Sequence, residues 1–451
     1  MQNFFIDNSL NAVNRVRRAV GPKWLSHTRF AIETPDETIN KFFSETAEDT
    51  ESRISLPFGL RLLKSRWLQS TKEPSSTSAT ETAAAASLIS LFSTELAEEM
   101  LRPFFTNQSA EGYFPEKIDA LSISHTPATP LFFNTVLNLA RTSTLKDQAA
   151  IFSALRKHFD WLVLHKKEQD GLYAHGGEKW FDSDPMVFEL RREISESQAS
   201  IFELRSVAFN ALIAFQTQCM ARLAGMWGLE KDAAKYEDFA GQLADNITKN
   251  LWSGEQGCFM DKIGDKAKPA SLISNMLTLA AEIPTRAQAA GMAARINELI
   301  DNLKIIIQCP EIAPAFLLIA DGLVKYRFVK EAESLSLEIL RYVYSLGRAG
   351  KYFIPRAVAQ ILLVREILGY NFFKDRLVIY PKLPEVWLGQ TIRIRSGRDP
   401  MTICLIPQNN NIIDCVFATA AGPLLETTIE NYSFKNFQLP IKKDGSPDSH
   451  A

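Results

Sequence analysis

Apolar residues recur every three or four positions along most of the chain after residue 80. This spacing places them on one face of an α-helix. It predicts helices at residues 80–102, 130–142, 146–165, 197–227, 230–251, 270–281, 285–303, 312–326, 328–346 and 356–369. The connections carry residues that end helices and turn the chain, such as Gly228, Pro284 and Gly347. The chain is therefore expected to be mainly α.

The predicted helices are joined by alternately short and long connections. Two antiparallel helices need only a few residues at their tight end, so this alternation predicts stacked helical hairpins arranged as a barrel. The long connections then gather on one face of the barrel. A binding site is expected there, because a rigid scaffold commonly presents its functional residues on loops.

The pattern changes after Gly369, where short β-branched or alternating runs occupy residues 376–380, 391–395, 401–405, 412–416 and 425–429. These runs predict a small antiparallel β-element at the C-terminal end. The resulting organisation is an irregular N-terminal segment packed on the barrel at residues 1–80, with a flexible loop at 71–82. The helical barrel spans 81–370, the β-element 371–440 and a disordered tail 441–451.

Charge and composition exclude several classes of protein. Fifty basic and 52 acidic side chains give a formal net charge of −2, which does not favour binding to nucleic acid or to an anionic membrane. Five scattered cysteines without CxxC spacing argue against a disulfide framework. No uncharged apolar run of about 18 residues is found, and the first residues lack the apolar core of a signal peptide. A cytoplasmic location is expected.

Common cofactor motifs are absent from the sequence. It has no GxxxxGK[ST], no GxGxxG after a strand, no HExxH and no GxSxG, and its six histidines are spread along the chain. These absences argue against nucleotide, nicotinamide and zinc chemistry. We therefore expect neither a cofactor nor a metal ion.

A long loop from Asp170 to Pro185 combines acidic and aromatic side chains. Sugars stack their apolar faces on aromatic rings, while carboxylates bind their hydroxyl groups, so this composition suits a glycan site. A carboxyl group desolvated by Trp180 also gains a raised pKa, as a general acid requires. The candidate residues are Tyr173, Glu178, Trp180, Phe181, Asp182 and Asp184. The alternative is an exposed loop in which Ser183 or Asp184 caps a helix.

Two further groups of residues flank this loop in the sequence. Tyr113, Phe114 and His125 lie in proline-rich segments that lead to the helix predicted near Pro130, and they are candidates for the pocket rim. The alternative is a rigid structural connection. Glu203 and Arg205 lie on an apolar helical face as further candidates, with a solvated ion pair as the default interpretation.

Several motifs occur in an order that resembles a known group of enzymes. They are Gly112-Tyr-Phe-Pro115 with Thr126-Pro-Ala-Thr-Pro-Leu-Phe132, Trp161 with Asp170-Gly-Leu172, Trp180-Phe-Asp182-Ser-Asp-Pro185, and Asp375-Arg-Leu-Val-Ile-Tyr-Pro-Lys-Leu-Pro384 with Trp387. This order resembles the six-hairpin barrel glycosidases, especially glycoside hydrolase family 63, mannosylglycerate-hydrolase-like proteins and the glucosidase part of glycogen-debranching proteins. The resemblance implies an (α/α)6 toroid, a saccharide substrate and Asp182 as general acid.

Two departures from that group bear on activity. Its early aromatic motif has no clear counterpart in residues 20–75, and the segment Tyr344–Pro355 contains no acid where the group carries its general base. Inverting hydrolysis requires two carboxyl groups. The remaining candidates for the base are Glu178, Asp184, Glu203 and Glu311.

Three hypotheses follow. The first is an inverting glycoside hydrolase, the second is a non-catalytic saccharide-binding relative that lacks the base, and the third is a structural or partner-binding helical array. Saccharide turnover separates the first from the second. A saccharide-dependent rise in melting temperature separates the second from the third.

Overall fold

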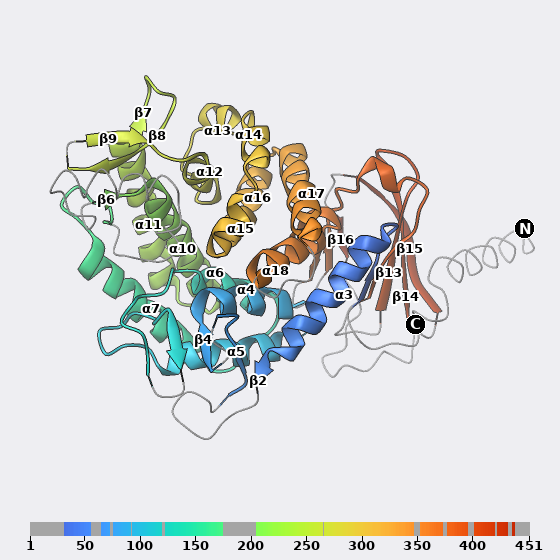
Figure 1. The fold of residues 1–451 in the computed structure, drawn as a ribbon, viewed down its shortest axis with the longest axis horizontal. Helices are drawn as coiled ribbons and strands as arrows, with labels where there is room; N and C mark the ends of the chain where they lie inside the picture. Colours follow the sequence, from blue (N-terminus) through green and yellow to red (C-terminus); the bar gives the residue numbers. More distant parts are fainter. Residues whose placement is uncertain are drawn as a thin grey trace, which may run out of the picture.

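The computed structural model describes residues 31–55, 65–72, 75–91, 93–119, 122–174, 204–264, 266–346, 352–372, 377–395, 401–419, 422–431 and 435–437. Over these ranges the protein is mainly helical and has an antiparallel sheet near its C-terminal end (Figure 1). The predicted combination of helices and a C-terminal β-element is therefore confirmed.

Six helices form a closed ring in which each contacts the next and the last contacts the first. In order, they are α4 (Ala79–Ile89), α6 (Phe132–Thr142), α10 (Val207–Met226), α12 (Leu272–Ala280), α16 (Ala313–Lys325) and α18 (Phe353–Leu362). Most of their residues are buried, as in α4 and α10, because these helices are covered on more than one side. The ring supplies much of the hydrophobic core.

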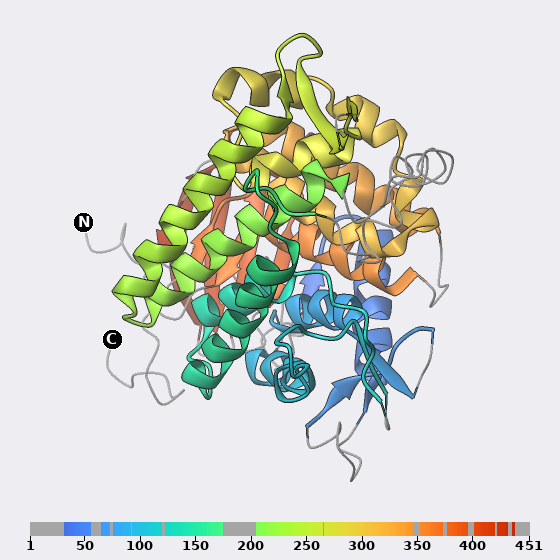
Figure 2. The same ribbon diagram turned by 90° about the vertical axis from the view of Figure 1, so that its left-hand side faces the viewer.

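Amphipathic helices surround this ring and pack against it or against one another. They include α3 (Glu37–Ser52), α5 (Thr94–Thr106), α7 (Gln148–Lys166), α11 (Glu230–Leu251), α13 (Arg286–Ala293), α14 (Ile296–Asp301) and α17 (Val329–Ser345). Helix α11 shows the pattern well, because Tyr236, Ala240, Leu243, Ile247 and Leu251 are buried at helical spacing. It contacts α10 closely, and Figure 2 shows these two long helices side by side in green.

The helices α10, α12 and α16 meet at their C-terminal parts. The Gln218 side-chain amide donates to the Ala281 carbonyl at 2.8 Å, and Lys325 Nζ donates to the Ala280 carbonyl at 2.5 Å. Gly322 allows the close approach, because a Cβ there would lie 2.7 Å from the backbone of Leu279 and Ala280. These helix ends therefore lie together.

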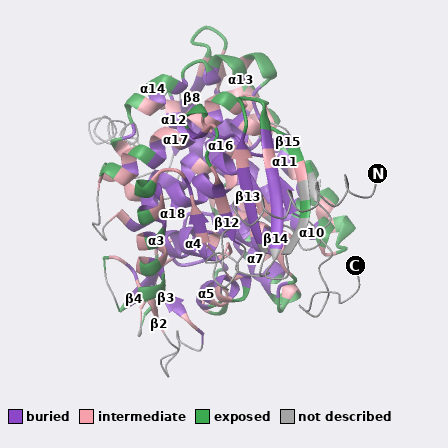
Figure 3. Ribbon diagram, turned by 90° about the vertical axis from the view of Figure 1, so that its right-hand side faces the viewer, coloured by how far each residue is buried: buried purple, intermediate pink, exposed green. Residues whose placement is uncertain are grey.

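Five antiparallel strands form the main sheet in the order β1-β12-β13-β14-β15. Figure 3 labels β12 to β15 of this sheet. The strands are β1 (Ala31–Glu33), β12 (Ile392–Arg395), β13 (Met401–Pro407), β14 (Ile412–Thr419) and β15 (Gly422–Glu430). Alternate residues enter the core, as in the pair formed by Ile394 and Ile403. A second sheet joins β10 (Tyr370–Phe372), β11 (Leu377–Ile379) and β16 (Lys435–Phe437).

The structure differs from the predicted elements in several helical segments. Within the helix expected at 197–227, Leu204–Arg205 form strand β6 and α10 begins at Val207, so Arg205 does not lie on a helical face as predicted. The helix expected at 80–102 is divided into α4 and α5, because the Ser93 side chain accepts a hydrogen bond from Leu96 N and starts a new helix. The segment at 285–303 is divided into α13 and α14. The helix predicted at 230–251 matches α11.

The described part of residues 1–80 is more regular than the expected irregular segment. Helix α3 begins at its cap Asp36 and runs for four turns, and β1 joins the C-terminal sheet. The expected loop at 71–82 instead contains β4 (Ser76–Ser78) and the start of α4. Among the described helices, none combines the length and the apolar character needed to cross a bilayer.

Candidate active site

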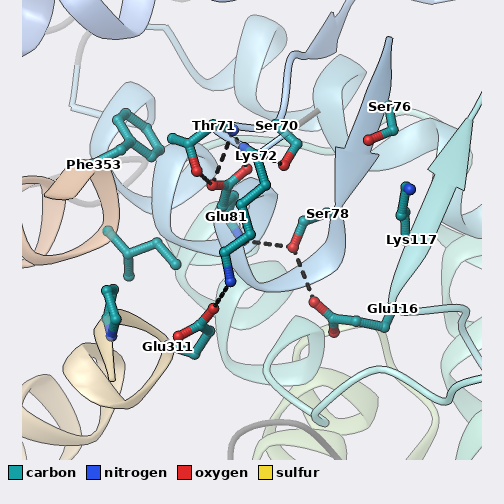
Figure 4. A pocket seen from close by; sticks show the side chains of 12 residues that line it. Ser70, Thr71, Lys72, Ser76, Ser78, Glu81, Glu116, Lys117, Glu311 and Phe353 are labelled. Carbon is teal, nitrogen blue, oxygen red and sulfur yellow. Dashed lines mark hydrogen bonds and ion pairs between the residues drawn. The ribbon is translucent and has the colours of Figure 1, made fainter. Parts of the chain in front are cut away.

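A pocket that is partly open to solvent lies at the N-terminal ends of α4, α16 and α18 (Figure 4). Its wall includes the segment around Thr71, strand β4, and the 3-10 helix η2 (Pro310–Ile312) that precedes α16. Three carboxylates line it, those of Glu81, Glu116 and Glu311. Phe353 adds an apolar surface.

Glu81 is held in the first turn of α4. The Ser78 hydroxyl accepts a hydrogen bond from Glu81 N at 3.5 Å and caps the helix. The Glu81 carboxylate accepts hydrogen bonds from Thr71 N at 3.0–3.1 Å and from the Thr71 hydroxyl. Only 6% of Glu81 is exposed. Its orientation is therefore fixed from the neighbouring segment.

Glu116 reaches the pocket from the position just before β5 (Lys117–Asp119), the strand that pairs with β4. Its carboxylate accepts hydrogen bonds from the Ser78 hydroxyl at 2.9 Å and from the Thr80 hydroxyl at 3.3 Å, and its carbonyl accepts one from Ala79 N at 2.8 Å. The residue is buried, and Pro115 before it pairs with Pro127. Hydroxyl groups on one helix end thus orient a carboxylate from a separate segment.

Glu311 and Lys72 form an ion pair across the pocket. Lys72 Nζ lies 2.5 Å from Glu311 Oε1, and the Lys72 side chain is largely exposed while 19% of the Glu311 side chain is exposed. The hydrogen bond to Glu311 raises the pKa of Lys72, with smaller contributions from Glu81 and Glu116, while desolvation opposes the rise. The ammonium therefore stays charged at neutral pH among three carboxylates.

These groups suit the binding of a polyhydroxylated ligand. Carboxylates accept hydrogen bonds from hydroxyl groups, and a carboxylate that water can reach is able to take a proton from it. Within the described ranges, no group of three or more histidine, cysteine, aspartate or glutamate side chains could hold a metal ion.

Two of the sequence-predicted residues, Tyr113 and Phe114, are buried in an aromatic cluster. The Tyr113 ring lies 5.1 Å from Trp161, and the Phe114 ring lies 4.8 Å from His158. His125 is exposed. None of these three side chains lines the pocket described above. Their role in substrate binding stays a prediction.

Tyr173 and Arg205 lie near the start of α10. Tyr173 is fully buried, and its backbone N donates to Asn210 Oδ1 at 2.7 Å. Arg205 forms an ion pair with Asp170 at 3.3 Å and approaches Glu168 at 3.6 Å. The first residues of the acidic loop, Asp170 and Tyr173, are therefore tied to the segment around the start of α10. The role of both residues in ligand binding also stays a prediction.

The other predicted site residues lie outside the described ranges. They are Glu178, Trp180, Phe181, Asp182, Asp184 and Glu203. The structure therefore leaves the assignment of Asp182 as general acid untested.

Lys72, Glu81 and Glu116 are pocket residues that sequence analysis did not select. Glu116 ends the motif from which Tyr113 and Phe114 were chosen, so the motif was recognised but its carboxylate was not. Ser78 and Glu81 form the S-x-x-E pattern of a helix start, which was a usable signal. Glu311 was one of four candidate bases and is the one that lies within the described residues.

A sequence model of the mannosylglycerate hydrolase MGH1-like glycoside hydrolase domain matches residues 76–304, just over half of the chain. The chain belongs to this family. The MGH1-like region begins at β4 and includes α4, α6, α10 and α12 of the ring. It contains Glu81 and Glu116, whereas Lys72 and Glu311 lie beyond its ends. A comparison with curated proteins gives no match.

Solved structures share the fold of this MGH1-like protein at low sequence identity. The family 63 mannosylglycerate hydrolase of Thermus thermophilus in complex with glucose is 16% identical, with a TM-score of 0.53, covering 70% of this chain and 98% of that one. A family 78 rhamnosidase of Bacillus sp. GL1 is 12% identical, with a TM-score of 0.59, covering 87% of this chain and 40% of that one. These likenesses support the predicted glycosidase fold.

Proposed function

We propose that this protein hydrolyses an O-glycosidic bond of an oligosaccharide or small glycoside, and that the reaction takes place in the carboxylate-lined pocket. The observation that carries the proposal is the gathering of Glu81, Glu116 and Glu311 at the N-terminal ends of ring helices in a glycoside hydrolase family member. We further propose that the ring and its flanking helices form an (α/α)6 toroid, in keeping with the closed contacts of the six helices.

The proposed mechanism is inversion, with Asp182 as general acid and Glu311 as general base. Inversion requires two carboxyl groups about 6.5–9.5 Å apart, so that a water molecule fits between the base and the sugar. Glu311 meets the first requirement of a base, because its side chain is partly exposed in the pocket and water can reach it. Lys72 would hold its carboxylate in place through their ion pair.

The remaining residues would bind the sugar. Glu81 and Glu116 are oriented by hydroxyl and backbone donors, and their carboxylate oxygens would accept further hydrogen bonds from sugar hydroxyls. The aromatic residues of the acidic loop, Trp180 and Phe181, would stack on the sugar ring. Glu178 and Asp184 would contact its hydroxyl groups.

The test is turnover of an oligosaccharide and aryl-glycoside panel by the wild type and by Asp182→Asn and Glu311→Gln. Each substitution is expected to lower kcat by about 10²–10⁴, because it removes a proton-transfer group. Glu298→Gln is the matched control, since Glu298 pairs with Arg295 on the exposed surface. Wild-type turnover that neither substitution lowers would refute these two roles.

One observation favours a second candidate function, saccharide binding without hydrolysis. The segment Tyr344–Pro355 contains no acid where the resembled group carries its base. If Glu311 is not a base, calorimetry should show that saccharides of the same panel bind to the protein, while no product forms. Wild-type turnover that Glu311→Gln abolishes would exclude this second function.

A further inference from the structure

Basic side chains gather at the end of the helical ring opposite the pocket. They are Arg141 in the last turn of α6, Arg222 in the last turns of α10, Lys325 at the end of α16, and Arg365 in the π-helical turn Leu363–Ile367 after α18. The Ala280 carbonyl at the end of α12 accepts a hydrogen bond from Lys325. We call these four residues the basic cluster.

Two carboxylates accompany the basic cluster, and their pairing is incomplete. Glu282 lies 3.0 Å from Lys325 and 3.8 Å from Arg222, and Asp321 lies 3.7 Å from Arg365. Four cations and two carboxylates leave a net charge of +2 at this end of the ring. The two arginine contacts are longer than a hydrogen bond, so donors of Arg222 and Arg365 stay available.

Among the four residues of the basic cluster, Arg141 makes the fewest polar contacts with the surrounding protein. It is half-buried, and within the described ranges its guanidinium makes no hydrogen bond or ion pair. Burial lowers the pKa of Arg141, and the neighbouring charges of Arg222 and Arg365 lower it further, while Cys219 and the carboxylate of Asp321 oppose the decrease. An arginine nevertheless keeps its charge in proteins and carries five N–H donors. A partly desolvated cation that makes no hydrogen bond or ion pair is costly, and a bound anion would offset that cost.

We propose that the basic cluster is a binding site for a small oxyanion, with Arg141 as the main ligand and Arg222 and Arg365 beside it. Planar guanidinium groups bind oxyanions through pairs of parallel hydrogen bonds, which suits a phosphate, sulfate or carboxylate group. The Arg222 and Arg365 side chains are 42% and 25% exposed, so an anion can enter from solvent. This site goes beyond the proposed hydrolase function and does not depend on it.

The test is a calorimetric titration of the full chain with inorganic phosphate, in chloride buffer at constant ionic strength, together with thermal melting. We expect saturable binding and a phosphate-dependent rise in melting temperature. Arg141→Gln should weaken phosphate binding at least tenfold. Without phosphate, this variant should be no less stable than the wild type, because the substitution removes repulsion from Arg222 and Arg365.

The control is Arg295→Gln, which removes an equally charged but exposed and paired arginine and should leave phosphate binding unchanged. If Arg141→Gln does not fold, Arg222→Gln replaces it and is expected to weaken binding severalfold. A second titration with a hexose 6-phosphate identifies the source of the anion. Equal affinities indicate a free anion, and affinity at least tenfold tighter for the ester indicates a sugar phosphate. Absence of saturable binding by the wild type, or equal binding by wild type and variant, would overturn the proposal.

Discussion

The two ends of the helical ring carry opposite charge. The pocket end places three carboxylates around Lys72, whereas the other end places four cations around Asp321 and Glu282. Helix N-termini favour negative charge and C-termini favour positive charge, so part of this contrast follows from the direction of the helices. Charge alone is therefore a weak indication of function. The more informative feature is the contacts that each charge makes. Hydroxyl groups donate to the Glu116 carboxylate, whereas the Arg141 guanidinium makes no hydrogen bond or ion pair within the described ranges.

The largest loss of stability is expected when the buried ion pair of Lys382 and Glu366, next to the basic cluster, is broken. Their charged atoms are 2.5 Å apart, and the side chains are 1% and 10% exposed. Lys382→Met should lower the free energy of unfolding by about 3–5 kcal/mol, because it leaves a buried carboxylate unpaired. Urea unfolding measures the loss. The double variant Lys382→Met/Glu366→Leu should recover most of it, and equal stability of the single and double variants would contradict this account.

A smaller effect is the pH dependence of stability that arises from His158, which contacts the segment that carries Glu116. His158 is fully buried, and its Nδ1 accepts a hydrogen bond from Phe114 N at 3.2 Å. Burial lowers the pKa of His158 to about 3, while the unfolded value is near 6.5. Above pH 6.5, His158 is therefore neutral in both the folded and the unfolded state, and its burial costs no deprotonation. Stability should fall by about 1.4 kcal/mol per pH unit as the pH drops below that value.

Urea unfolding at pH 7.0 and pH 5.5 tests this slope, in a window above the ordinary pKa of carboxyl groups. His158→Phe should remove most of the slope, whatever its effect on absolute stability. The exposed His125 provides the control, since His125→Gln should keep the slope of the wild type. A slope that persists in His158→Phe would assign the pH dependence to another group.

The smallest effect concerns Ser78, which caps α4 and also orients Glu116. Ser78→Ala should cost about 1 kcal/mol of unfolding free energy, the usual loss for a helix cap. It should also weaken saccharide binding, because Glu116 loses a donor, whereas Ser93→Ala at the cap of α5 should cost similar stability and leave binding unchanged. Equal saccharide affinity of the two variants would show that Ser78 acts as a cap alone.

Local patterns in the sequence were enough to predict many of the elements. The apolar spacing of residues 230–251 matched α11, and the run at 412–416 lies within β14. Helix α3 was missed because prolines near both ends and a polar composition suggested irregular structure. The pairing of β1 with β12 joins residues about 360 positions apart, and neither strand pattern specifies its partner.

The candidate site was predicted less completely for the same reason. Glu81 and Lys72 lay in or beside a Ser- and Thr-rich stretch that was interpreted as a flexible loop. Glu311 was considered, but its position depends on a contact with Lys72, 239 residues earlier in the chain. Side chains that are assembled from distant segments leave no local spacing to recognise.

The short strand β1 at the edge of the main sheet also bears on how the protein is made. Its three residues can pair with β12 only after residues 392–395 have left the ribosome, so the sheet is completed late in synthesis. Until then, β1 lacks its partner and its backbone groups can pair with other chains. Because β1 has only three residues, the unpaired edge that the growing chain exposes during this time is short.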